Sequence, residues 1–242
     1  ATATKASLYI LARILFNVFE NSEDLINNTL LYVILPLSII AMFAGTIMAI
    51  YEKDIKRLLA HSSVAQIGYI TLAFAIGTKA SIAAGFIHMF NHAIIKGGLF
   101  IAITSLGFFI QKRVTINNLS GLGRAMPITF FCFVLCSLSL AGLPLTAGFI
   151  SKLYLIKATI SSDAIWIAIL ILISSALSVV YLWKMIEVMW MREGRKIVIK
   201  ENPAIYISLI IITFFNIYFG LDASLVVNGS FEAAEKLIGD LK

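Results

Sequence analysis

The chain has 242 residues, of which 60% are hydrophobic and only 13% are charged, and its mean hydropathy is +0.95. Soluble domains carry about 25% charged residues, so this composition excludes an ordinary water-soluble fold. The apolar residues come in blocks of about 18 or more with almost no charge, which indicates bilayer-spanning helices. We therefore predict an all-α, polytopic integral membrane protein. A transmembrane β-barrel would show alternating segments of about ten residues, and the sequence has none.

The formal net charge of +6 indicates basic cytoplasmic loops and not nucleic-acid binding, because no basic patch is interleaved with aromatic residues. The two cysteines, Cys132 and Cys136, lie four residues apart in an apolar block and are interpreted as packing residues. The sequence lacks a haem-ligand pair, a dinucleotide-binding glycine motif and an iron–sulfur cysteine set. It therefore predicts no cofactor and no redox site of its own.

Seven membrane helices are predicted in chain order. The first extends to about Phe19, and an acidic, asparagine-rich loop follows it. The chain begins without Met and without a signal peptide, which predicts that it is part of a longer protein that was cut within a helix. Residues 1–220 are expected to form the transmembrane domain, and residues 221–242 an amphipathic tail. The later helices are expected over about 30–50, 58–76, 81–109, 127–160, 164–191 and 203–220.

The apolar segment 127–160 is interrupted by Gly142, Pro144 and Gly148. As one straight helix it would be about 51 Å long, whereas the hydrocarbon core is about 30 Å thick. A single crossing places the basic loop 192–200 on the same side as the other basic loops, as the positive-inside rule requires, and two crossings would not. We therefore predict one discontinuous helix. Broken helices of this kind form ion sites in transporters.

Three ionisable residues share one face of the predicted fourth helix. His88, His92 and Lys96 have the spacing i, i+4, i+8, so each lies about 6 Å further along the axis. Imidazole gives and takes protons near neutral pH, and a lysine removed from water loses its preference for the charged form. The row therefore predicts a proton pathway. Two alternatives stay open, a polar packing stripe and a zinc site for which the sequence offers no third ligand.

Other basic residues are weaker candidates from the sequence alone. Lys152 follows the break in the discontinuous helix, where unpaired backbone groups are expected, although it could also snorkel to the membrane surface. Lys5 lies in an apolar helix, and a snorkelling lysine explains it equally well. Lys56 and Arg57 have the placement of ordinary topology anchors.

Four motifs in order resemble those of the antiporter-like membrane subunits of respiratory complex I, Mrp-type sodium/proton antiporters and membrane-bound hydrogenases. The motifs are DIKRLLAHSSVAQIGY (54–69), HMFNHAIIKGGLF (88–100), GLGRAMP (121–127) and LAGLPLTAGFISK (140–152). The resemblance implies that the chain holds helices eight to fourteen of a fourteen-helix fold, with the second of two inverted repeats. The first repeat, which brings an ion pair in relatives, would then be absent.

The resemblance also assigns roles to individual residues. Lys5 would be the central lysine of a buried axis, and Lys152 the terminal lysine near the proton exit. His61 stands where many relatives have Tyr, and it is a candidate accessory residue together with Ser63. The complete implied axis is Lys5, Lys56, His88, His92, Lys96 and Lys152.

The resemblance predicts a proton-translocating subunit, with sodium/proton antiport as a close alternative. A third hypothesis is a scaffold that only helps to assemble a larger complex. The expected partners are homologous antiporter-like subunits, small membrane subunits, the lipid bilayer and protons or sodium ions, with no nucleic acid. The expected location is a bacterial or archaeal cytoplasmic membrane, with the mitochondrial inner membrane as the alternative.

Overall fold

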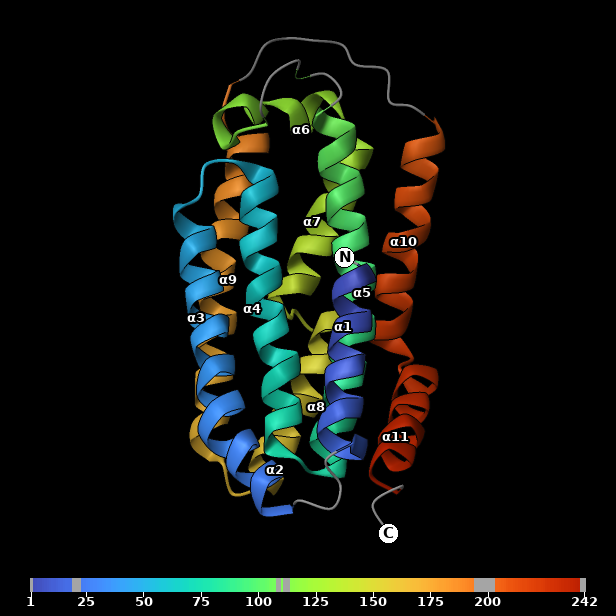
Figure 1. Ribbon diagram of the computed structural model, residues 1–242. Coiled ribbons are helices and arrows are strands. Elements are labelled where there is room, and N and C mark those ends of the chain that lie inside the picture. Colours follow the sequence, from blue (N-terminus) through green and yellow to red (C-terminus); the bar gives the residue numbers. More distant parts are fainter. Residues whose placement is uncertain (1, 19–22, 108–109, 111–113, 194–202, 240–242) are drawn as a thin grey trace.

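The protein is a bundle of long helices, as the sequence predicts (Figure 1). The computed structural model describes residues 2–18, 23–107, 110, 114–193 and 203–239. Within them the extended structure is confined to one bridge, between Asp54 and Thr115. The elements are α1 (Thr2–Arg13), the π-helix η1 (Ile14–Val18), α2 (Glu23–Thr29), the π-helix η2 (Leu30–Ile34), α3 (Leu35–Tyr51), α4 (Ile55–Ile76), α5 (Lys79–Gly107), the 3-10 helix η3 (Ile116–Leu119), α6 (Leu122–Ala125), α7 (Pro127–Ala141), α8 (Ala147–Ser161), α9 (Ile165–Trp190), α10 (Pro203–Leu221) and α11 (Ser224–Gly239).

Five helical segments of the described chain are long and apolar enough to span a bilayer: Ile26–Tyr51, Ile55–Ile76, Lys79–Gly107, Ile165–Trp190 and Pro203–Leu221. A sixth is counted only if the pair Ile116–Ala125 and Pro127–Ala141, bent by 119°, forms one span. The predicted number of about seven is therefore not confirmed. The physical reason is length, because α1 has 12 residues and α7 and α8 have 15 each, whereas a lone span needs about 20.

The segment predicted as one discontinuous helix forms α7 and α8, which lie end to end inside the bundle (Figure 1). Helix α7 ends where Gly142 adopts the left-handed conformation, with φ of 90°. Helix α8 begins after Thr146. Because α9 then returns in the opposite direction beside them, the two half-helices together make one pass through the bundle.

The turn before α4, the segment before α7 and the end of α9 gather at one end of the bundle. The Ile55 N–H donates to the Val114 carbonyl at 3.0 Å, and the Arg124 guanidinium donates to the Trp190 carbonyl at 2.7 Å. These contacts place three of the basic segments on one side, as the single crossing requires. The remaining basic positions of the loops (112, 113, 195, 196 and 200) lie outside the described residues.

Close helix packing fixes the face that α4 presents to α5. A Cβ atom on Gly68 would lie 2.7 Å from the Met42 nitrogen, so α3 and α4 approach each other backbone to backbone. Small residues permit such contacts in membrane helices. The opposite face of α4 then directs Ser62 and Gln66 toward the bundle interior, where both are buried.

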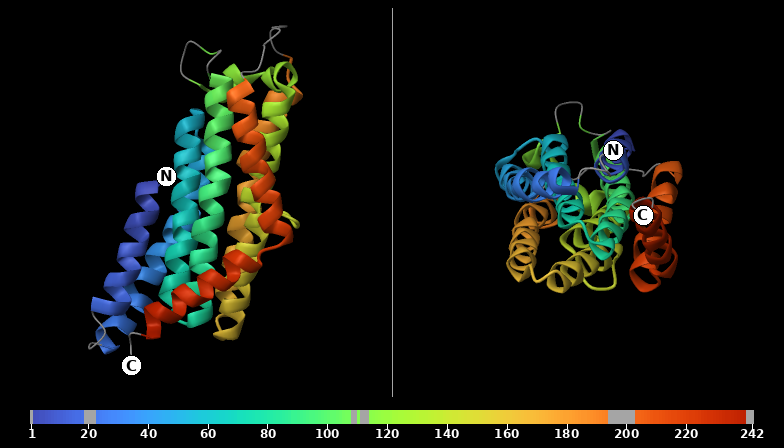
Figure 2. Two further views of the ribbon diagram at one scale, coloured as in Figure 1. Left: turned by 90° about the vertical axis from the view of Figure 1, so that its right-hand side faces the viewer. Right: turned by 60° about the horizontal axis from the view of Figure 1, so that its bottom comes forward.

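Helix α11 lies obliquely across the bundle and contacts α5 and η1 (Figure 2). It buries Val226, Ala234 and Leu237. The Lys79 ammonium and the Glu235 carboxylate lie 2.9 Å apart and join α5 to α11 at the surface. The division of the chain at residue 220 into a membrane domain and a tail stays a prediction.

Candidate functional site

The three ionisable residues predicted on one helix face are all buried on α5. His88 is 3%, His92 2% and Lys96 0% exposed. The rings of His88 and His92 are nearly parallel, with centroids 6.3 Å apart. Buried polar groups need partners to offset the loss of water, so the surroundings of each residue decide what it can do.

His88 is held at both ring nitrogens by side chains from two other helices. Its Nε2 lies 2.9 Å from Oε1 of Gln66 on α4, and its Nδ1 lies 2.9 Å from the Ser151 hydroxyl on α8. A neutral imidazole donates at one nitrogen and accepts at the other. His88 therefore forms a continuous hydrogen-bonded link between α4 and the first turn of α8.

His92 has no hydrogen-bond partner in the described protein at either ring nitrogen, although both atoms are buried. It lines a cavity of about 310 Å³ together with Thr4, Lys5 and Ser63. Lys96 lies one helical turn beyond His92 on α5. This cavity brings the predicted residues Lys5 and Ser63 beside His92.

Lys96 donates hydrogen bonds to α4. Its ammonium lies 2.8 Å from the Leu59 carbonyl oxygen and also bonds the Ser62 hydroxyl. No carboxylate is among the buried polar side chains of the described chain. The neutral acceptors of α4 are therefore the direct support for this buried cation.

Substituting Ser62 with alanine is expected to destabilise the protein by about 1–3 kcal/mol, because a hydrogen bond to a charged group is lost in the interior. Thermal unfolding of the purified protein in detergent measures this. The neighbouring Ser63→Ala is the control, since the Ser63 hydroxyl bonds only the Leu59 carbonyl of its own helix. Equal shifts for the two variants would contradict the role assigned to the Ser62 hydroxyl.

Lys152 lies in the first turns of α8 and reaches back to the end of α7. Its ammonium donates to the carbonyl oxygens of Leu140 (3.0 Å) and Ala141 (2.8 Å) and to the Ser175 hydroxyl (2.7 Å). The ring of Tyr69 lies below it, with the centroid 5.5 Å from Nζ. The last carbonyls of a helix lack intrahelical partners and carry partial negative charge. Lys152 therefore caps α7 and does not snorkel.

We name His88, His92, Lys96 and Lys152 the buried basic cluster. Tyr69 and Ser151 connect its His88 to the region of Lys152: the Tyr69 ring contacts both the His88 ring, at 5.5 Å between centroids, and the Lys152 ammonium, and Ser151 bonds His88. The cluster thus runs along α5 and turns into the break between α7 and α8.

Two predicted residues lie apart from the buried basic cluster. Lys56 is exposed in the first turn of α4, where Asp54 caps the helix. His61 is partly exposed, and its Nε2 lies 3.8 Å from the Glu52 carboxylate. Hydrogen bonds from the Asp54 and Lys53 N–H groups hold the pKa of Glu52 below its ordinary value. The place of Lys56 in an axis stays a prediction from the resemblance.

Sequence reasoning missed several polar partners. Gln66 and Tyr69 lie on the inner face of α4, and their spacing of three residues within an apolar helix was an available signal. Tyr181 on α9 is fully buried beside Ser62, and its hydroxyl lacks a hydrogen-bond partner in the described chain. Nothing in the local sequence of α9 indicates which way Tyr181 points.

The zinc alternative gains no support from the described residues. They contain no group of three or more His, Cys, Asp or Glu side chains that could hold a metal ion. Both nitrogens of His88 are already engaged by Gln66 and Ser151.

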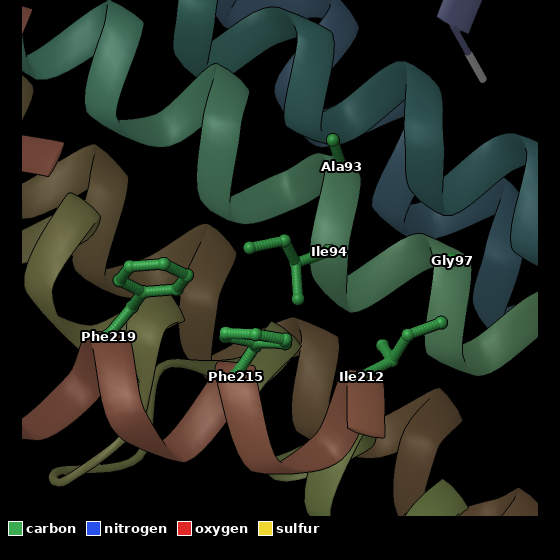
Figure 3. Close-up of a pocket in the computed structure, with 6 residues that line it drawn as sticks. All are labelled: Ala93, Ile94, Gly97, Ile212, Phe215 and Phe219. Carbon is green, nitrogen blue, oxygen red and sulfur yellow. The ribbon is translucent and has the colours of Figure 1, made fainter. Parts of the chain in front are cut away.

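A second pocket, between α5 and α10, is apolar. Figure 3 shows Phe215 and Phe219 on α10 opposite Ala93 and Gly97 on α5. No side chain that lines it is polar, so it lacks the groups for proton or ion chemistry and lies outside the candidate site.

Comparison with known proteins agrees with this architecture. Residues 1–178 match the family described as NADH:quinone oxidoreductase/Mrp antiporter, TM. NADH-quinone oxidoreductase subunit N of Desulforudis audaxviator is 37% identical over 188 residues, which is 77% of this chain and 37% of that protein. F(420)H(2) dehydrogenase subunit N of Methanosarcina mazei is 35% identical over 162 residues, or 64% of this chain and 33% of that one.

Solved structures have the same fold. A chain of the membrane-bound sulfane sulfur reductase, an archaeal respiratory membrane complex, superposes with a TM-score of 0.83 at 29% identity, over 96% of this chain and 47% of that chain. A chain of the Mrp complex from Dietzia sp. has a TM-score of 0.87 at 23% identity, over 97% of this chain and 51% of that one. This chain therefore spans between a third and a half of these relatives. It is an integral membrane protein and belongs to the NADH:quinone oxidoreductase/Mrp antiporter transmembrane family.

Proposed function

We propose that this chain carries protons across the membrane along the buried basic cluster, as part of a subunit of a larger complex. The observation that carries the proposal is the hydrogen-bonded link from His88 on α5 to Ser151, next to Lys152 at the break. Ionisable side chains in the membrane interior are unfavourable and mark ion or proton pathways. Relatives that are subunits of NADH-quinone oxidoreductases and chains of an Mrp complex support this assignment.

The proton steps at His88 and Lys152 use side chains of this chain. His88 accepts a proton at one ring nitrogen and releases the proton from the other, which leaves the ring in the opposite tautomer. The Lys152 amine takes up a proton to become an ammonium ion that the carbonyls of Leu140 and Ala141 stabilise. At the other end, the cavity beside His92 has room for several water molecules that would connect its ring to Lys5.

The surroundings of Lys152 favour a proton over a sodium ion as the transported species. In transporters with broken helices, freed carbonyls and helix C-termini coordinate Na⁺. Here the Lys152 ammonium already donates hydrogen bonds to the carbonyl oxygens at the end of α7. The buried polar side chains of the described residues also include no carboxylate that would complete a sodium site.

The test is proton translocation by the reconstituted parent complex carrying Lys152→Ala or His92→Ala. Each change is expected to reduce the rate at least about tenfold, because general acid–base groups contribute factors of about 10² to 10⁴. The matched control is Lys157→Ala, which removes an exposed lysine of the same helix α8. Unchanged translocation in both test variants would refute the proposal.

Measurements on the same reconstituted complex also distinguish the two alternative functions predicted from the sequence, sodium/proton antiport and an assembly scaffold. Sodium-dependent exchange that continues without the redox reaction would favour antiport. Loss of complex assembly with unchanged coupling in the remaining complexes would favour a scaffold.

A further inference from the structure

Helix α10 packs against the break between α7 and α8 and forms a hydrogen bond to the end of α7. The Ser139 hydroxyl, in the last turn of α7, donates to Oδ1 of Asn216 at 2.7 Å. The Ser139 hydroxyl oxygen in turn accepts a hydrogen bond from the Gly148 N–H, in the first turn of α8, at 3.1 Å. Asn216 is fully buried in the predominantly apolar helix α10. One hydroxyl therefore ties the two half-helices to each other and to a third helix.

A second contact one turn further along α10 fixes the same segment. Gly220 lies so close to the main chain of Leu145 and Thr146 that a side chain there has no room. Asn216 and Gly220 are four residues apart and so lie on one face of α10. That face of α10 therefore packs against the end of α7 and against the break that precedes α8.

This arrangement decides where the acceptors of Lys152 lie. The Leu140 and Ala141 carbonyls, which receive its ammonium, directly follow Ser139 in the chain. Lys152 itself is one turn beyond Gly148, whose N–H bonds Ser139. A shift of Ser139 relative to Gly148 would therefore move the ammonium away from its acceptors.

We propose that Asn216 is a positioning residue for Lys152: through Ser139 it holds the end of α7 and the start of α8 at the separation that gives the ammonium its carbonyl acceptors. The consequence for translocation rests on the function proposed above. The Lys152 ammonium also lies over the Tyr69 ring of α4 and donates a hydrogen bond to Ser175 of α9. Its chain neighbour Ser151 bonds His88 of α5.

The first test is hydrogen exchange of the segment 142–148 in the assembled complex carrying Asn216→Leu. Leucine has a similar volume but no acceptor for the Ser139 hydroxyl. Because an intramolecular hydrogen bond is lost, exchange at the Gly148 amide is expected to become about fivefold faster. The matched control is Thr213→Val on the same helix, since Thr213 is buried against Cys136 and lies one turn from Asn216.

The second test is a double-mutant cycle on the rate of proton translocation. Asn216→Leu is expected to lower the rate on the order of tenfold, because a small misplacement of a transfer group is enough to slow it. Ser139→Ala also removes the acceptor of the Gly148 N–H and is expected to lower the rate at least as much, and the double variant no more than Ser139→Ala alone. Thr213→Val is expected to stay within about twofold of the wild type. A general packing defect would give additive losses and would also affect the control.

The outcomes separate the two proposals. Unchanged exchange at Gly148 in Asn216→Leu overturns the positioning role, and so does faster exchange with an unchanged translocation rate when Lys152→Ala itself slows translocation. Additive losses in the double variant overturn it as well. If Lys152→Ala translocates at the wild-type rate, the proposed function fails, and faster exchange in Asn216→Leu still supports the role of Asn216 in holding the break.

Discussion

Replacing Lys96 with methionine is expected to reduce proton translocation by the assembled complex about a hundredfold while leaving the helix bundle folded. Methionine has a similar length and removes only the ammonium. The Ser62 hydroxyl keeps an acceptor, because it also bonds the Leu59 carbonyl at 3.0 Å. The buried cation and its desolvation penalty therefore disappear together, whereas the transfer group, worth a factor of about 10² to 10⁴, is lost.

The measurement is the initial rate of acidification in vesicles that contain the reconstituted complex, with the amount of assembled complex quantified in parallel. The control is Lys79→Met on the same helix α5, where the exposed ammonium pairs with Glu235. Exposed ion pairs contribute little, so this variant should translocate at nearly the wild-type rate. A Lys96→Met complex that retains more than about half the rate would remove Lys96 from the pathway.

Adding a single methyl group at Gly148 is expected to destabilise the protein by about 3 kcal/mol, at the upper end of the range for overpacking. In Gly148→Ala the new Cβ would overlap the Ser139 carbonyl oxygen and lie 2.8 Å from its carbon. Both atoms belong to main chain inside the bundle and have no free rotation to relieve the clash. The start of α8 must then separate from the end of α7.

Thermal unfolding in detergent and the yield of monodisperse protein measure this effect. Gly97→Ala is the matched control, since a Cβ at Gly97 on α5 meets nothing within 4 Å. Alanine is favoured over glycine in a helix by about 1 kcal/mol, so the control is expected to be as stable as the wild type or more stable. Equal melting temperatures for the two variants would show that the half-helices are less tightly packed than the structure indicates.

The helical bundle and much of the site could be predicted from the sequence, because local periodicity and chain-breaking residues determine them. The i, i+4, i+8 spacing placed His88, His92 and Lys96 on one buried face of α5. Gly142 marked the end of α7, where it adopts a left-handed conformation that other residues rarely take.

Other features depend on contacts between distant segments and leave no local signal. The partners of the cluster, such as Gln66 for His88 and Ser175 for Lys152, come from helices far away in the chain. For Lys56 the local charge pattern was the better guide. Its exposure agrees with that pattern, whereas its place in the buried axis was predicted only from the resemblance. The predicted number of about seven spans is not confirmed, because a half-helix is too short to be counted as a span by its own length and composition.

The acceptors of Lys152 have a consequence for how this position responds to mutation and acidity. A peptide carbonyl carries no titratable proton in the biological pH range and is present whatever the side chain, so two of the three acceptors that stabilise this ammonium belong to the backbone, and the third is the Ser175 hydroxyl. These contacts involve no acidic side chain, so no substitution of an acidic residue removes an acceptor of Lys152. Damaging substitutions should instead concentrate at the lysine and at the small residues that shape the gap between the two half-helices.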